Sequence, residues 1–154
     1  MDVIIRKCID YVSENIEIVC QNATPGASGC LDCFQNQFFN DNIISYDCDL
    51  KINIYVGRYF PVHVRENIEA LKLLPPEYID KLLNLNTINV MNIGGGPGSD
   101  SFAVKKYFHG LERSGLIKDK KDIYILRVDR ETNWNNMAGF VNERIKNTDV
   151  INNG

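Results

Sequence analysis

Apolar residues recur at a three-four spacing near the N-terminus, a pattern that predicts an amphipathic helix with one buried stripe. The stripe consists of Ile5, Cys8, Ile9, Val12, Ile16, Val19 and Cys20. Residues 22–29, rich in small and turn-forming types, predict a loop, and 30–42 is ambiguous, with a short helix as one interpretation. Residues 51–56 alternate and are interpreted as a strand or an extended lead. A second helix is expected over about 62–74.

Two prolines end that second helix, because proline has no amide hydrogen and disfavours helix in the residue before it. Pro76 can then open a third helix that continues through Leu83. Residues 1–85 are therefore expected to form a helical N-terminal region.

The pattern changes from residue 86 onward. Residues 87–93 predict a short strand that leads into the glycine run 94–98, and a helix follows, marked by Ala103, Tyr107, Gly110 and Leu111. Residues 123–128 predict a second strand, the next segment a helix through Ile145, and 149–151 the start of a third strand. This βαβαβ order predicts an α/β fold, a partial Rossmann-like doubly wound parallel sheet, over residues 86–154.

Composition is that of a globular protein, with 44% hydrophobic and 24% charged residues in 154. The net charge of -3 provides no clear electrostatic footprint for nucleic acid. No apolar run is long enough for a bilayer, and charges interrupt residues 1–20, so neither a membrane partner nor a secretory signal is expected. Together with an odd number of cysteines, five, this favours a cytoplasmic location.

The cysteines raise one question about metal. Cys30 and Cys33 form a CxxC pair, and Cys20, Cys48 and His63 lie in the same half of the chain. A structural zinc site is therefore one interpretation of these residues, although a CxxC without a second pair favours thiols that hold no metal. We predict no metal site.

The segment 92–100 (N-I-G-G-G-P-G-S-D) carries the clearest chemistry. Glycines at 94, 96 and 98 permit unusual backbone conformations and let a ligand approach closely. The amides at the start of the next helix point toward that ligand. Asp129 follows the second strand at the same edge of the sheet, where a carboxylate can accept hydrogen bonds from both ribose hydroxyls. The pattern predicts an adenosine-bearing cofactor, and the alternative is a tight turn without a ligand.

The glycine spacing narrows the choice of cofactor. A phosphate-binding loop needs Lys and Ser/Thr after its last glycine, and a dinucleotide fingerprint needs glycine where Ser99 stands. The Gly-x-Gly-x-Gly form resembles class I S-adenosylmethionine (SAM) dependent methyltransferases, whose first motif matches 93–98 and whose second matches 128–130. The resemblance implies a SAM site built from Asn92, Gly94, Gly95, Gly96, Pro97, Gly98, Asp129 and Arg130.

Asn92 stands where that family usually has Asp or Glu, so its contact with the charged end of SAM would lack charge assistance. Trp134 is expected in the core, with adenine contact as the alternative. His63 and His109 have no partner recognisable in the sequence, and no catalytic residue is predicted.

The resemblance implies transfer of a methyl group to an unknown acceptor, mainly by positioning and desolvation. In the family the fold continues through a fourth strand at the acceptor side, so the chain is expected to be a truncated domain without its acceptor half. An oligomer, a partner or the N-terminal helices could alternatively cover the open sheet edge. The functional alternatives are a non-catalytic, partner-binding module of the same fold and an NAD(P)-dependent oxidoreductase.

Overall fold

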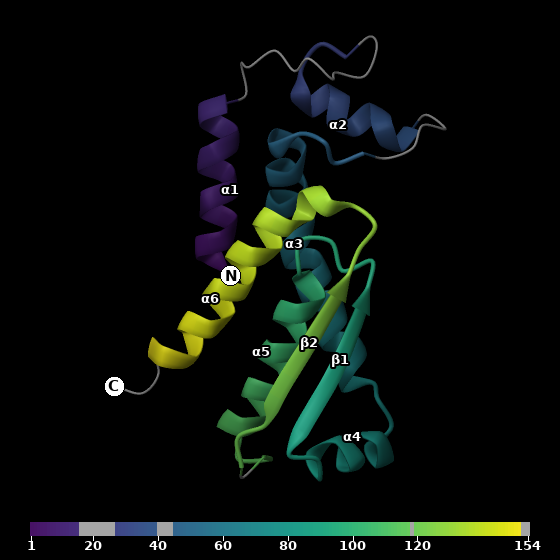
Figure 1. The fold of residues 1–154 in the computed structure, drawn as a ribbon, viewed down its shortest axis with the longest axis vertical. Helices are drawn as coiled ribbons and strands as arrows, with labels where there is room; N and C mark the ends of the chain where they lie inside the picture. The colour runs from purple at the N-terminus through teal and green to yellow at the C-terminus, as the bar shows by residue number, and fades with distance from the viewer. Residues whose placement is uncertain (16–26, 40–44, 118, 152–154) are drawn as a thin grey trace.

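The computed structural model describes residues 1–15, 27–39, 45–117 and 119–151, and its fold is mixed α/β (Figure 1). Within these ranges the elements run in the order α1 (Asp2–Asn15), α2 (Cys30–Phe39), α3 (Asp49–Lys72), α4 (Pro76–Leu83), β1 (Thr87–Ile93), α5 (Ser99–Arg113), β2 (Asp122–Val128), a 3-10 turn η1 (Thr132–Trp134) and α6 (Asn135–Ile151).

Strands β1 and β2 form a parallel pair, in register from Thr87 opposite Asp122 to Ile93 opposite Val128. Helix α5 connects them, so β1, α5 and β2 make a βαβ unit, as the sequence predicts. One face of this sheet packs on α5 in a cluster built around Ile88, Val104, Phe108 and Ile117. The carboxyl ends of both strands point toward the part of the molecule that holds α3 and the start of α6 (Figure 1).

The opposite face of the sheet is exposed. In Figure 1 no helix is drawn in front of the two arrows, and α5 lies behind them. The large apolar side chains that alternate outward there are 43% to 80% exposed, and we call them the uncovered sheet face: Met91, Ile93, Tyr124, Leu126 and Val128.

Helix α3 joins the N-terminal helices to the βαβ unit. Helices α1 and α5 both pack along it. The main core cluster draws Ile4 and Cys8 from α1, Phe60 from α3, Ala103 from α5 and Val141 from α6, and each of these is at most 1% exposed. The N-terminal helices and the βαβ unit therefore share one hydrophobic core.

Helix α3 also corrects the prediction of a strand or extended lead over residues 51–56, since all of these residues are helical. Ile52 and Val56 pack in the main core, whereas Leu50 and Ile54 pack on the other side of the helix against Cys30 and Phe34 of α2. A helix that is buried on two sides shows no single apolar stripe, and its composition then resembles that of a strand.

The structure also decides two further predictions of secondary structure. The ambiguous region after residue 30 forms α2, but residues 149–151 continue helix α6, so the third strand predicted there is wrong. The apolar spacing of Met137, Val141 and Ile145 establishes this helix, and a helix propagates easily once nucleated. The strand preference of Val150 and Ile151 depends on their surroundings and does not end the helix here. Ile16, Val19 and Cys20 of the first predicted stripe lie outside the described residues. In the described ranges, no helix combines the length and apolarity that crossing a membrane requires.

Candidate functional site

The glycine turn, residues 94–98, connects β1 to α5. Its alternating glycines have positive φ angles of 70° at Gly94, 45° at Gly96 and 93° at Gly98, which only glycine adopts without strain. The amides of Gly94 and Gly95 donate to the carbonyl of Val128, at 2.8 and 3.3 Å, and attach the turn to the end of β2. The predicted glycine positions are therefore required by the backbone.

The glycines differ in what surrounds them. A Cβ at Gly95 would lie 2.7 Å from Cγ of Arg127, so packing alone excludes a side chain there. A Cβ at Gly94 or Gly96 would meet nothing within 4 Å. This open space above the turn is where a ligand can approach the backbone.

Asp129 lies beside the turn, as predicted, and holds it in place. Its Oδ2 accepts a hydrogen bond from the amide of Gly96 at 2.7 Å, and its Oδ1 accepts one from the amide of Glu131 at 2.8 Å. Each carboxylate oxygen has a second lone pair. Asp129 can thus hold the turn and still accept hydrogen bonds from a ligand.

Arg127 is the basic residue at the turn. Its Nη1 donates to the carbonyl of Gly96 at 3.2 Å, and its Nη2 donates to Oδ1 of Asn135 at the start of α6. Arg130, the basic residue predicted for the site, is exposed. The sequence offered a signal for Arg127, because strand alternation places it on the covered face with Ile125, where a charged side chain needs a partner.

Asn92 and Asp100 stabilise the start of α5. Asn92 is 8% exposed, and its Nδ2 donates to Oγ of Ser101 at 3.0 Å. Asp100 accepts a hydrogen bond from Nδ2 of Asn67, on α3, at 2.7 Å. A cavity of about 350 Å³ opens between these elements, lined by Asn67, Leu71, Met91, Asn92, Ile93 and Asp100.

Aromatic rings from α3, from η1 and from residue 46 pack together. Trp134 is 3% exposed and belongs to the main core, in agreement with the expected packing role. Its ring centroid lies 4.3 Å from that of Tyr46 and 5.2 Å from that of Tyr55. Tyr55 also packs on Tyr59, one turn further along α3, at 5.2 Å.

Two of these phenols have raised pKa values. Burial raises the pKa of Tyr46 most, followed by Tyr55, Tyr59 and the carboxylate of Asp129. Burial also raises the pKa of Tyr55, with smaller contributions from Asp100, Tyr59 and Asp129. Both phenols therefore remain protonated at neutral pH, close to the carboxylates of the turn.

His63 has two partners that the sequence did not reveal. Its Nε2 lies 3.2 Å from the hydroxyl of Tyr55, and its Nδ1 lies 3.2 Å from Oε2 of Glu66. The signal was the spacing of Tyr55, Tyr59 and His63, four residues apart on one face of α3, which the strand interpretation of 51–56 concealed. His109 is less closely paired, with Nδ1 3.6 Å from Glu112.

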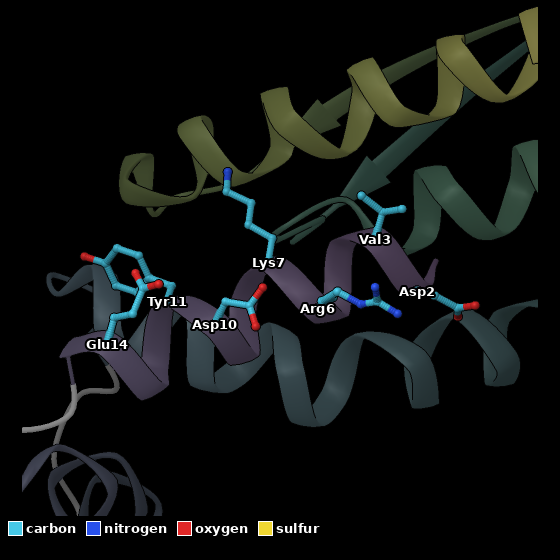
Figure 2. Close-up of a pocket in the computed structure, with 7 residues that line it drawn as sticks. All are labelled: Asp2, Val3, Arg6, Lys7, Asp10, Tyr11 and Glu14. Atoms are coloured by element: carbon cyan, nitrogen blue, oxygen red, sulfur yellow. The ribbon is translucent and has the colours of Figure 1, made fainter.

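A separate hollow of about 570 Å³ lies along α1, whose residues are distant in sequence from His63 and from the glycine turn (Figure 2). Figure 2 shows Lys7 reaching toward α6, where its Nζ lies 3.7 Å from the ring centroid of Phe140. The hollow is lined by Asp2, Val3, Arg6, Lys7, Asp10, Tyr11 and Glu14. Mixed charges of this kind are typical of a solvated helix face, and no predicted site residue belongs to it.

For the metal question, no group of three or more His, Cys, Asp or Glu side chains suited to a metal ion occurs in the part of the chain that the structure describes. Cys30 and Cys33 lie in the first turn of α2, and both are buried. Cys20 lies outside the described residues.

Comparisons with known proteins add no relative to this description: no family model matches the chain, and neither does any curated protein or solved structure.

Proposed function

We propose that this chain binds S-adenosylmethionine over its glycine turn and acts in methyl transfer to an acceptor still to be identified. One observation carries the proposal: positive-φ glycines with open space above Gly94 and Gly96, next to the carboxylate of Asp129. The backbone there is open to a ligand, and the carboxylate can accept hydrogen bonds from ribose hydroxyls.

Charge favours this cofactor over a dinucleotide. Asp100 and Asp129 both lie at the turn, and both act on the pKa of Tyr55, so they are near the same phenol. With the one guanidinium of Arg127, these two carboxylates leave a net negative charge around the turn, which disfavours the pyrophosphate of a dinucleotide and favours the sulfonium and ammonium groups of SAM. Asn92, buried against Ser101, would contribute through its position at the end of β1 rather than through charge.

The fold is compatible with the same proposal. The βαβ unit would be the cofactor-binding part of a Rossmann-like sheet, whose ligands lie beyond the carboxyl ends of the strands. Such a sheet has helices on both faces, and the uncovered sheet face is the surface where the second layer would pack.

Calorimetric titration of the chain with S-adenosylhomocysteine (SAH), with NAD as the comparison ligand, tests the proposal. The informative variant is Gly96→Ala, because its new methyl group would enter the space assigned to the ligand. Gly115→Ala is the matched control: Gly115 also has a positive φ, 76°, and open space around it, but it follows the opposite end of α5.

We expect SAH to bind the wild-type chain and Gly115→Ala, and not Gly96→Ala. Both variants should lose a similar stability, about 1 kcal/mol, from the strained backbone. Binding of NAD in place of SAH would indicate an oxidoreductase. A folded chain that binds neither ligand would overturn the proposal and favour a partner-binding module.

A further inference from the structure

A row of hydrogen-bonded side chains runs along α3 beside the proposed cofactor site. Tyr55, His63 and Glu66 form it, with both of its distances at 3.2 Å. A neutral imidazole has one donor and one acceptor nitrogen, and an ionised carboxylate only accepts. With Glu66 ionised and His63 neutral, the proton lies on Nδ1 of His63, and Nε2 accepts the hydroxyl proton of Tyr55.

Tyr55 connects this row to the segment that follows Asp129, because its ring centroid lies 5.2 Å from that of Trp134. Tyr46, before α3, and Tyr59, on α3, pack on its ring, and Asp100 of α5 and Asp129 after β2 raise the pKa of its phenol. The far end of the row reaches solvent, since the side chains of His63 and Glu66 are 37% and 66% exposed. A proton that enters at Tyr55 can therefore leave through His63.

We propose that Tyr55 and His63 take up the proton of the methyl acceptor, and that the acceptor is a hydroxyl compound. This inference rests on the proposed function. A hydroxyl oxygen is a weak nucleophile while it holds its proton, so it benefits from a base within reach, whereas a thiolate does not need one.

The transfer balances in atoms and charge. The acceptor oxygen forms a bond to the methyl carbon, and the carbon–sulfur bond breaks with its electron pair remaining on sulfur. The acceptor proton passes to the oxygen of Tyr55 as the proton of Tyr55 passes to Nε2 of His63. One sulfonium cation, one hydroxyl acceptor and a neutral imidazole become SAH, a methyl ether and an imidazolium, which Glu66 stabilises and solvent deprotonates.

The test measures single-turnover transfer from methyl-labelled SAM to catechol and to thiophenol across pH, after SAH titration has shown binding. His63→Gln should retain SAH binding but lower transfer to catechol by roughly a hundredfold to ten-thousandfold. The catechol rate of this variant should also depend less on pH than the wild-type rate does. Transfer to thiophenol should stay at its wild-type rate. His109→Gln is the matched control, because His109 also faces a glutamate three residues later.

Catechol transfer by His63→Gln at the wild-type rate and with the wild-type pH profile would overturn the inference. So would a chain that binds SAH and methylates thiophenol but not catechol. A chain that fails to bind SAH refutes the proposed function and the inference built on it, and the titration identifies that failure before any transfer is measured. Should His63→Gln not fold, nitrogen NMR of the wild-type chain decides: an Nδ1–H tautomer of His63 supports the relay, and an Nε2–H tautomer overturns it.

Discussion

Asp129 provides the sharpest test of how the glycine turn is held. Its two oxygens each accept one backbone hydrogen bond, from Gly96 at 2.7 Å and from Glu131 at 2.8 Å. In Asp129→Asn one of these oxygens becomes an amino group, which donates and cannot accept. One of the two amides then loses its partner, even though the size of the side chain hardly changes.

The expected loss can be worked from these bonds. A hydrogen bond to a charged group contributes about 1.5–3 kcal/mol, and Asp129 is half-buried, so about 2 kcal/mol is expected for Asn. Asp129→Ala loses both bonds and should lose about 3–4 kcal/mol. For a urea dependence of about 2 kcal/mol per molar, Asp129→Asn should lower the unfolding midpoint by about 1 M.

Urea unfolding without any ligand is the assay, followed by fluorescence of Trp134, which lies in the core near the turn. Asp122→Asn is the control, since Asp122 is an exposed residue at the opposite end of β2 and should change stability little. An Asp129→Asn variant that unfolds at the wild-type urea concentration would refute the claim that these two hydrogen bonds stabilise the glycine turn. If it also failed to bind SAH, Asp129 would be a ligand contact only.

Three further perturbations test the packing. Gly95→Ala should lower the free energy of unfolding by about 1–3 kcal/mol, because its Cβ would lie 2.7 Å from Arg127; unchanged urea unfolding would contradict this. Burial raises the pKa of the Cys8 thiol from 9.0 to about 11, and the charge of Lys7 opposes this rise. The free energy of unfolding should therefore be constant below pH 9 and fall by up to about 2–3 kcal/mol toward pH 11, because the thiol of the unfolded chain ionises first. Urea unfolding across pH should show this fall, and Cys8→Ala should remove it. Leu126→Ser, on the uncovered sheet face, should change stability by less than about 0.5 kcal/mol but reduce self-association, measured by sedimentation, if this face associates.

The βαβ unit could be predicted because its signals are local. The predicted bounds of β1 coincide with the observed strand, and α5 begins directly after the glycine turn. Alternation in a short strand and glycine at positive φ are properties of consecutive residues. They do not depend on what the rest of the chain packs against, so the sequence alone carries them.

Helix α3 could not be predicted in full for the opposite reason. Its first two turns are buried between two clusters, with Ile52 on one side and Leu50 and Ile54 on the other. Only the arrangement of α1 and α2 around it explains the apolar residues there. Likewise, the residues at the end of α6 follow the helix that precedes them, although Val150 and Ile151 favour strand by type.

In the candidate site, too, local features could be predicted from the sequence and contacts between distant residues could not. Glycine and Asp129 positions follow from the strand-turn-helix pattern, whereas the contacts of Arg127 with Gly96 and of Asn67 with Asp100 join residues more than thirty positions apart. Such contacts depend on how elements pack. The pair of Tyr55 and His63 is local, but the sequence does not reveal it, because residues 51–56, which include Tyr55, are interpreted as a strand or an extended lead.

These contacts also bear on how the turn would bind a ligand. Val128, Asp129 and Arg127 fix the backbone of the turn through hydrogen bonds that need no cofactor. Ordering the turn is therefore completed when the chain folds and does not weaken binding, which is the advantage of a preorganised site. Helix α3, which carries Tyr55 and Asn67, is likewise fixed by the core, because its residue Phe60 is fully buried there. A chain without α3 would therefore lack both Tyr55 and Asn67, the hydrogen-bond partner of Asp100.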